Sequence, residues 1–115
     1  MVGLMPYRSG PVHEVKASLF RVLGHPARVR ILELLRDGER SVGALQDELG
    51  LDSGGTSQHL AALRRIGLVD SRRDGTSVYY RVDDPQVYAL LDAGRAVITR
   101  RLAEQQAILH ELETT

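Results

Sequence analysis

Apolar residues recur at three- and four-residue spacing along most of the chain, which is typical of amphipathic helices. The first such stretch covers residues 12 to 24 and ends at Gly24. A second helix is predicted to start at Pro26, because a proline at the first helical position lacks only an N–H that would be unpaired there. Its apolar face is dense, and Gly38 marks its end. The chain therefore opens with two helices joined by a very short turn.

Two shorter helical segments come next. Ser41 suits the N-cap of the third helix, and Gly50 can take the left-handed conformation that ends it. The fourth helix is capped by Asp52 or Ser53 and ends at Gly67. Only a few residues therefore separate the third helix from the fourth.

The fourth helix has a clear buried side and a weak start. Its apolar stripe consists of Leu60, Leu63 and Ile66. Gly54 and Gly55 each lower helix propensity by about 1 kcal/mol. We therefore expect the first turn of this helix to fray.

The clearest hairpin of the chain follows the fourth helix. Two strand-like segments, residues 68–73 and 76–82, flank the dipeptide Asp74-Gly75. This dipeptide is favoured in two-residue hairpin turns, because these turns need a positive φ. The pattern predicts one small two-stranded β-hairpin in a chain that is otherwise mostly helical.

A long helix is predicted to end the chain. Asp84 before Pro85 marks its start, and no breaker interrupts its apolar stripe, so it has about 28 residues and a length of about 42 Å. A domain of this size cannot cover so long a stripe, which indicates a partner helix from a second subunit. The side chains expected at this homodimer interface, from the first and last helices, are Val15, Leu19, Leu91, Val97, Ile98, Leu102 and Leu109.

Composition limits the class of protein. The chain has 115 residues, of which 43% are hydrophobic and 26% charged, as in one folded domain. We divide it into a flexible N-terminal arm, residues 1–11, and a single domain, residues 12–115. No apolar run of eighteen residues and no signal-peptide pattern is present, so we expect a cytoplasmic protein with no membrane partner. The absence of cysteine excludes disulfides, thiolate zinc sites and thiol redox switches.

Positive charge gathers in one part of the chain. The net charge is zero, but residues 53–82 contain five arginines against only Asp70 and Asp74. The planar guanidinium of arginine suits contacts with phosphate and guanine, although a preference for arginine can also reflect genomic base composition. The central segment is therefore the candidate for nucleic-acid binding.

Helix, short turn, helix and then hairpin is the order of elements in a winged helix-turn-helix. The chain resembles the ArsR/SmtB family in three motifs: LGHPARVRILELL at residues 23–35, VGALQDEL at 42–49 and TSQHLAALRRIGLV at 56–69. The wing residues 72–75 and 79–82 extend the resemblance. It implies a dimeric repressor with about five helices and a two-stranded wing, in which the terminal helices form the dimer and the fourth helix reads DNA.

The start of the fourth helix carries the expected base-reading residues. Thr56, Ser57, Gln58 and His59 place hydroxyls, an amide and an imidazole on its first exposed turns. Gln58 is the best candidate for a base contact, because its amide can pair with both N6 and N7 of adenine. The alternative is that these are ordinary solvated residues. We favour DNA contact, because the buried stripe leaves Ser57 and Gln58 on the outer face.

The two histidines near this helix have different interpretations. His59 is counted as a DNA contact, although it suits a role in supporting the helix or binding phosphate better than reading a base. His25 precedes Pro26 within the family motif, and we interpret it as structural.

Four arginines complete the expected DNA-binding set. Arg72 and Arg73 precede the tip of the wing, where they can reach the DNA backbone or the minor groove. A solvated hairpin tip is the alternative. Arg64 and Arg65 either hold phosphates or complement the C-terminal end of the helix dipole.

The metal sites that occur in the family are not recognisable here. The third-helix cysteine positions fall within residues 42–45, which hold no metal-binding side chain. By ungapped matching, the last-helix positions fall on Asp84, Gln86, Val97 and Arg100. The terminal helices also carry His13, Glu14, His110, Glu111 and Glu113, which we interpret as exposed polar residues. The alternative is a hard or borderline metal ion bound where these helices meet across a dimer. We expect no metal and no cofactor.

The sequence as a whole predicts a sequence-specific DNA-binding regulator, a repressor that binds an inverted-repeat operator as a homodimer. The alternative is a winged helix used for protein association, or a partner subunit without direct DNA reading. An enzyme is not expected, because no P-loop, nucleophile elbow, HExxH or paired-carboxylate motif is present. A small-molecule or ion effector would be of unknown identity.

Overall fold

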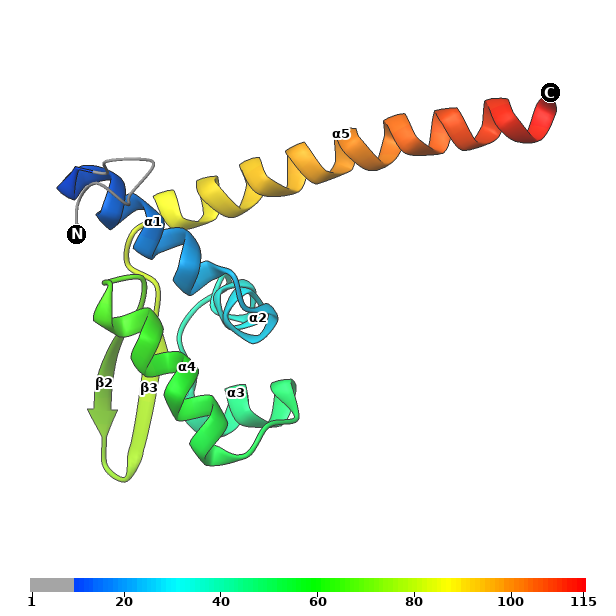
Figure 1. Ribbon diagram of the computed structural model, residues 1–115. Helices are drawn as coiled ribbons and strands as arrows, with labels where there is room; N and C mark the ends of the chain where they lie inside the picture. Colours follow the sequence, from blue (N-terminus) through cyan, green and yellow to red (C-terminus); the bar gives the residue numbers. More distant parts are fainter. Residues whose placement is uncertain (1–9) are drawn as a thin grey trace. The chain divides into compact units, whose positions relative to one another are not determined.

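The structure, a computed structural model, describes residues 10–115 and contains five helices and a small antiparallel sheet (Figure 1). In chain order the elements are α1 (Pro11–Leu23), α2 (Pro26–Leu34), β1 (Arg40–Ser41), α3 (Val42–Leu49), α4 (Ser53–Arg65), β2 (Asp70–Asp74), β3 (Ser77–Arg81) and α5 (Gln86–Thr114). This order confirms the predicted mostly helical winged helix-turn-helix. Most of the expected N-terminal arm lies outside the described residues, and α1 already begins at Pro11.

Side-chain caps define where the two central helices begin. Ser41 Oγ accepts a hydrogen bond of 3.1 Å from the N–H of Ala44, so the predicted N-cap of α3 is confirmed. Gly50 ends this helix with a φ of 66°. Asp52, and not Ser53, caps α4, because its Oδ1 accepts a bond of 2.7 Å from the N–H of Gly55. The first turn of α4, with both of its glycines, is helical.

The hydrophobic core lies among α2, α3 and α4. Leu60 and Leu63 of the predicted α4 stripe are fully buried, whereas Ile66 is only half-buried. The fully buried apolar side chains of the described residues are Ile31, Leu32, Leu45, Leu60 and Leu63. Packing of these three helices therefore fixes which side of α4 faces inward.

The sheet differs from the prediction in one strand and in the position of the turn. Strand β1, which was not predicted, pairs with β3 and gives the order β1-β3-β2. Asp74 pairs with Ser77, so the two turn residues are Gly75 and Thr76, one position later than predicted. Among the described residues only glycines have a positive φ, and Gly75 has one of 62°. Glycine at the first turn position alone is the pattern of a type II′ turn, which does not need the Asp-Gly pair of type I′.

The last helix forms a separate unit, residues 84–115. It has 29 residues, close to the predicted length, and runs as one uninterrupted helix (Figure 1). Asp84 Oδ1 accepts a hydrogen bond of 2.9 Å from the N–H of Gln86, which confirms the predicted start. No helix within residues 10–115 is both long and apolar enough to cross a membrane.

Gly54→Ala and Gly55→Ala form a matched pair that tests the Asp52 cap. A Cβ at position 54 would lie 3.8 Å from Asp52 Oδ1, an ordinary contact, whereas a Cβ at 55 would lie 3.0 Å from it. Gly54→Ala should therefore raise the free energy of unfolding by up to about 1 kcal/mol through helix propensity. Gly55→Ala displaces the capping carboxylate, and we expect loss of the cap, worth about 1 kcal/mol, to cancel that gain.

Urea denaturation of both variants measures the difference. Equal stabilisation by the two alanines would mean that the carboxylate of Asp52 does not constrain position 55.

Candidate nucleic-acid interface

The outward face of α4 carries part of the predicted DNA-binding set. Ser57, Gln58, Arg64 and Arg65 are exposed. Thr56 is fully buried, and its hydroxyl donates a hydrogen bond of 2.9 Å to the carbonyl oxygen of Asp52. The prediction that Thr56 lies on an exposed turn is therefore wrong, because its side chain extends the apolar stripe and satisfies its hydroxyl within the helix.

His59 lies at the edge of the outward face and is half-buried. Its Nδ1 accepts a hydrogen bond of 3.2 Å from Nε of Arg28, and its ring centroid is 4.3 Å from that of His25. Burial, and then the nearby charges of His25 and Arg28, lower the pKa of His59 below its ordinary value. The contact with Arg28 agrees with a role for His59 in supporting the helix. A contact between His59 and DNA stays a prediction.

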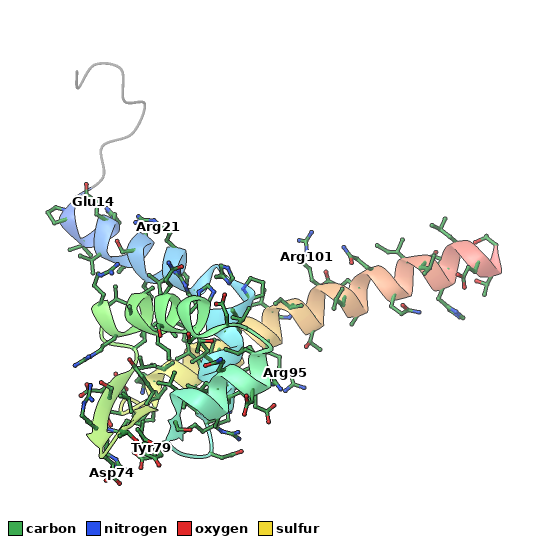
Figure 2. The ribbon with its side chains drawn as sticks, turned by 90° about the horizontal axis from the view of Figure 1, so that it is seen from below. Glu14, Arg21, Asp74, Tyr79, Arg95 and Arg101 are labelled. Atoms are coloured by element: carbon green, nitrogen blue, oxygen red, sulfur yellow. The ribbon has the colours of Figure 1, made fainter. Side chains whose placement is uncertain are left out.

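The two wing arginines lie on opposite faces of the sheet. Arg72 pairs across the strands with Tyr79, and Arg73 with Val78. The guanidinium of Arg72 lies 4.7 Å from the ring centroid of Tyr79, a residue marked near the wing in Figure 2. Arg72 Nε also donates to both carboxylate oxygens of Glu39, at 3.1 and 2.9 Å, and its terminal nitrogen donates to one of them.

This contact changes the pKa of both partners. The hydrogen bond from Arg72 lowers the pKa of Glu39, and the same bond raises the pKa of Arg72. The side chain of Arg73 is exposed and makes no hydrogen bond or ion pair within residues 10–115. Arg73 is therefore available to bind phosphate, whereas Arg72 already has an anionic partner.

A second group of paired charges lies at the base of the wing. Arg81 is 2.8 Å from Asp83 and 3.3 Å from Asp70, and Asp70 is 4.0 Å from Arg64. Together with residues 67–69, three of these side chains, those of Arg64, Asp70 and Asp83, line a shallow pocket. The positive charge of Arg64 is therefore partly offset.

The basic segment is thus divided into paired and unpaired arginines. Three of its five arginines have carboxylate partners, and two of those partners, Glu39 and Asp83, lie outside residues 53–82. Arg65 and Arg73 have no such partner within the described part of the chain. The count of charges along the sequence could not distinguish these two from the rest.

The predicted dimer residues lie on two helices, α1 and α5. On α1, Val15 is exposed and Leu19 half-buried. On α5, Leu91 is half-buried, and the exposed residues are Val97, Ile98, Leu102 and Leu109. Figure 2 shows side chains along the whole length of α5, including Arg101. Large apolar side chains that stay exposed when a chain folds indicate an interaction surface.

Metal-ligating side chains do not gather in the described residues. Within residues 10–115 no three His, Cys, Asp or Glu side chains are grouped closely enough to hold an ion.

Comparison with known proteins gives consistent matches. The family described as "bacterial regulatory protein, arsR family" matches residues 25–71. The uncharacterised HTH-type transcriptional regulator Rv0081 of Mycobacterium tuberculosis is 45% identical over 105 residues, which cover 90% of this chain and 92% of that protein. The crystal structure of Rv0081 superposes with a TM-score of 0.79 over 84% of this chain and 98% of its own.

Two further relatives carry more informative descriptions. A biofilm growth-associated repressor of Agrobacterium fabrum is 37% identical over 81 residues, 70% of this chain and 69% of that protein. The homodimeric winged helix-turn-helix DNA-binding domain Mb0332 of Mycobacterium bovis, solved by NMR, is 33% identical with a TM-score of 0.72, covering 85% of this chain and 94% of its own.

Arg72→Gln should raise the pKa of Glu39 toward its ordinary value, because the substitution removes the hydrogen bond that lowers it. A carboxyl group whose pKa is lowered on folding stabilises the fold above its ordinary pKa and loses that contribution as the pH falls. The free energy of unfolding of the variant should therefore fall less steeply as the pH is lowered. Carbon-13 NMR titration of the Glu39 carboxyl measures the shift.

Arg73→Gln is the matched control, since it removes the same charge from the opposite face of the same strand. If both variants leave the pKa of Glu39 unchanged, the Arg72 contact does not persist in solution.

Proposed function

Because the chain belongs to the ArsR family of bacterial regulatory proteins, we propose that it is a repressor that binds an inverted-repeat operator as a homodimer. The observation that carries this proposal is the outward face of α4, where Ser57, Gln58 and Arg65 are exposed while the opposite side of the helix is buried in the core. In a helix-turn-helix, the second helix enters the major groove of DNA. Here α4 is that helix.

Each exposed side chain suits a different part of the DNA. Gln58 can pair with adenine N6 and N7 and would read a base edge. Arg65 and Arg73 lack carboxylate partners within the described residues and would bind phosphates, with Arg73 reaching them from the wing. Ser57 is short and suits a contact with the DNA backbone. Arg64 and Arg72 would contribute less, because carboxylates already offset their charge.

A homodimer through the terminal helices accounts for the exposed apolar side chains of α1 and α5. The Mycobacterium bovis relative is described as homodimeric. A two-fold symmetric dimer would present two copies of α4, and the matching operator would be an inverted repeat with half-sites about 34 Å apart. Such a regulator would act in the cytoplasm, where bacterial DNA lies.

Gln58→Ala and Arg73→Gln should each weaken binding to a fragment of the gene's own promoter without unfolding the protein, because both residues are exposed. Gln58→Ala should cost about five- to a hundred-fold on the matching site and little on unrelated DNA. Arg73→Gln should weaken binding to the matching site and to unrelated DNA alike. It should also reduce the slope of log affinity against log salt by about 0.9 for each arginine removed.

Fluorescence anisotropy over a range of salt concentrations measures these effects. Arg72→Gln is the control for charge on the wing and should change the salt slope less than Arg73→Gln. Parent-like binding by both the Gln58 and Arg73 variants would show that the reading surface is assigned to the wrong residues.

Leu102→Glu should convert the dimer to a monomer at micromolar concentration, because a carboxylate would be buried without a partner at the proposed interface. Ala103→Glu is the matched control: it adds the same charge one residue later, about 100° further around α5 and away from the apolar stripe. Light scattering coupled to size-exclusion chromatography gives the mass of each variant. Equal masses for the two variants would place the dimer contact elsewhere.

A further inference from the structure

One arginine joins three helices at the edge of the outward face of α4. Arg28, in the first turn of α2, donates from Nε to Nδ1 of His59 on α4 at 3.2 Å. A terminal nitrogen of its guanidinium is 3.4 Å from the carbonyl oxygen of Val22, near the end of α1. We call the contact between Arg28 and His59 the Arg28–His59 bridge. Through it, the turn between α1 and α2 is connected directly to α4.

The Arg28–His59 bridge requires a neutral imidazole. Arg28 can only donate, so Nδ1 of His59 must carry a lone pair, and the ring proton is on Nε2. His25, whose ring is next to that of His59, also accepts at Nδ1: the N–H of Ala27 donates to it at 3.2 Å, and this bond caps α2. Protonation of His59 would direct an N–H at the guanidinium of Arg28. The bridge cannot form in that state.

The surroundings of His59 favour the neutral form. Burial is the largest cause of its lowered pKa, and the proximity of His25 and Arg28, both on the α2 side, lowers it further. Its neighbours one turn away on α4, Gly55, Thr56, Ala62 and Leu63, carry no charge. Because the pKa of His59 is lower in the folded protein, the bridged form is fully populated above the ordinary histidine pKa and is lost as the pH falls through the lowered pKa of the folded state.

His59 is adjacent in sequence to the proposed base-reading residue Gln58. The buried stripe holds α4 by its inner side, and the Arg28–His59 bridge holds the edge next to Gln58. We propose that Arg28 is a positioning residue for operator recognition: through neutral His59 it fixes the setting of α4, and acid releases α4 and weakens operator binding. This inference rests on the proposed function and adds a form of regulation to it.

The first test compares two arginines of α2 in the full chain. Arg28→Ala removes the bridge, whereas Arg30→Ala removes the same charge from an exposed position on the same helix. Anisotropy with the promoter fragment at about pH 7.5 should show Arg28→Ala binding about two- to ten-fold more weakly, the effect of one lost hydrogen bond, and Arg30→Ala changing affinity by less. Equal affinities for the two variants would overturn the proposal.

The second test is the pH profile of DNA binding. The parent should lose affinity by about two- to ten-fold between about pH 7.5 and about pH 5, a range that reaches below the ordinary pKa of histidine. His59→Asn supplies a carbonyl oxygen in place of Nδ1 and does not titrate, so the ratio of its affinities at about pH 7.5 and about pH 5 should be much smaller than that of the parent. His25→Asn keeps a capping oxygen and should retain the acid dependence. If His59→Asn keeps the profile of the parent, the proposal is wrong.

A readout without DNA separates this inference from the proposed function. In nitrogen-15 NMR of the histidine side chains, His59 should carry its proton on Nε2, and its pKa should rise in Arg28→Ala but not in Arg30→Ala. If the parent binds no promoter fragment, the proposed function fails, and the role in recognition fails with it. If the parent binds but His59 titrates identically in both variants, only the inference about Arg28 fails.

Discussion

The buried side of α4 is the constraint on which the rest of the candidate site depends. Thr56, Leu60 and Leu63 have no solvent exposure, and burying a leucine contributes about 1.5 to 3 kcal/mol. Because a helix has 3.6 residues per turn, fixing this side also fixes the opposite one. Ser57 and Gln58 are exposed for that reason. A rotation of α4 that moved Gln58 would expose the leucines, so packing in the core sets the direction of the reading face.

Ion pairs determine which of the arginines near this face keep an unpaired positive charge. The zero net charge of the chain and the five arginines of its central segment give little information until the partners of those arginines are known. Glu39 holds Arg72 against Tyr79 and so links the residue before β1 to the wing. That pair stabilises the position of the wing and withdraws one cation from the surface. Arg65 and Arg73 are then the two arginines of residues 53–82 whose charge no carboxylate within the described residues offsets.

The features that sequence could predict are those with local causes. Caps such as Ser41, left-handed glycines such as Gly50, and apolar spacing depend on residues a few positions apart, and they gave five helices and a hairpin in the right order. Strand β1 has only two residues and exists through pairing with β3, so no pattern marks it. The burial of Thr56 had a readable signal, because it lies four residues before Leu60 on the same stripe.

The contacts that pair some polar residues and leave others unpaired had no signal in the sequence. Arg72 and Glu39 are 33 residues apart, and Arg28 and His59 are 31 apart. Neither pair has any periodicity that connects its members, because each depends on how separate elements pack. Two residues that looked equivalent in the sequence, Arg72 and Arg73, therefore have different roles in the structure.

The apolar residues of α5 follow a regular spacing that keeps them on one side of the helix. Apolar residues in α5 repeat at a spacing of eleven, from Leu91 to Leu102, from Val97 to Ile108 and from Ile98 to Leu109. Eleven residues in three turns is about 3.67 per turn, close to the 3.6 of an undistorted helix, so the stripe stays on one side of α5 with little drift. A partner helix could follow such a stripe along much of its length. In the proposed dimer this long contact would hold the two subunits in a fixed relation, which is the condition for two copies of α4 to match an operator of fixed spacing.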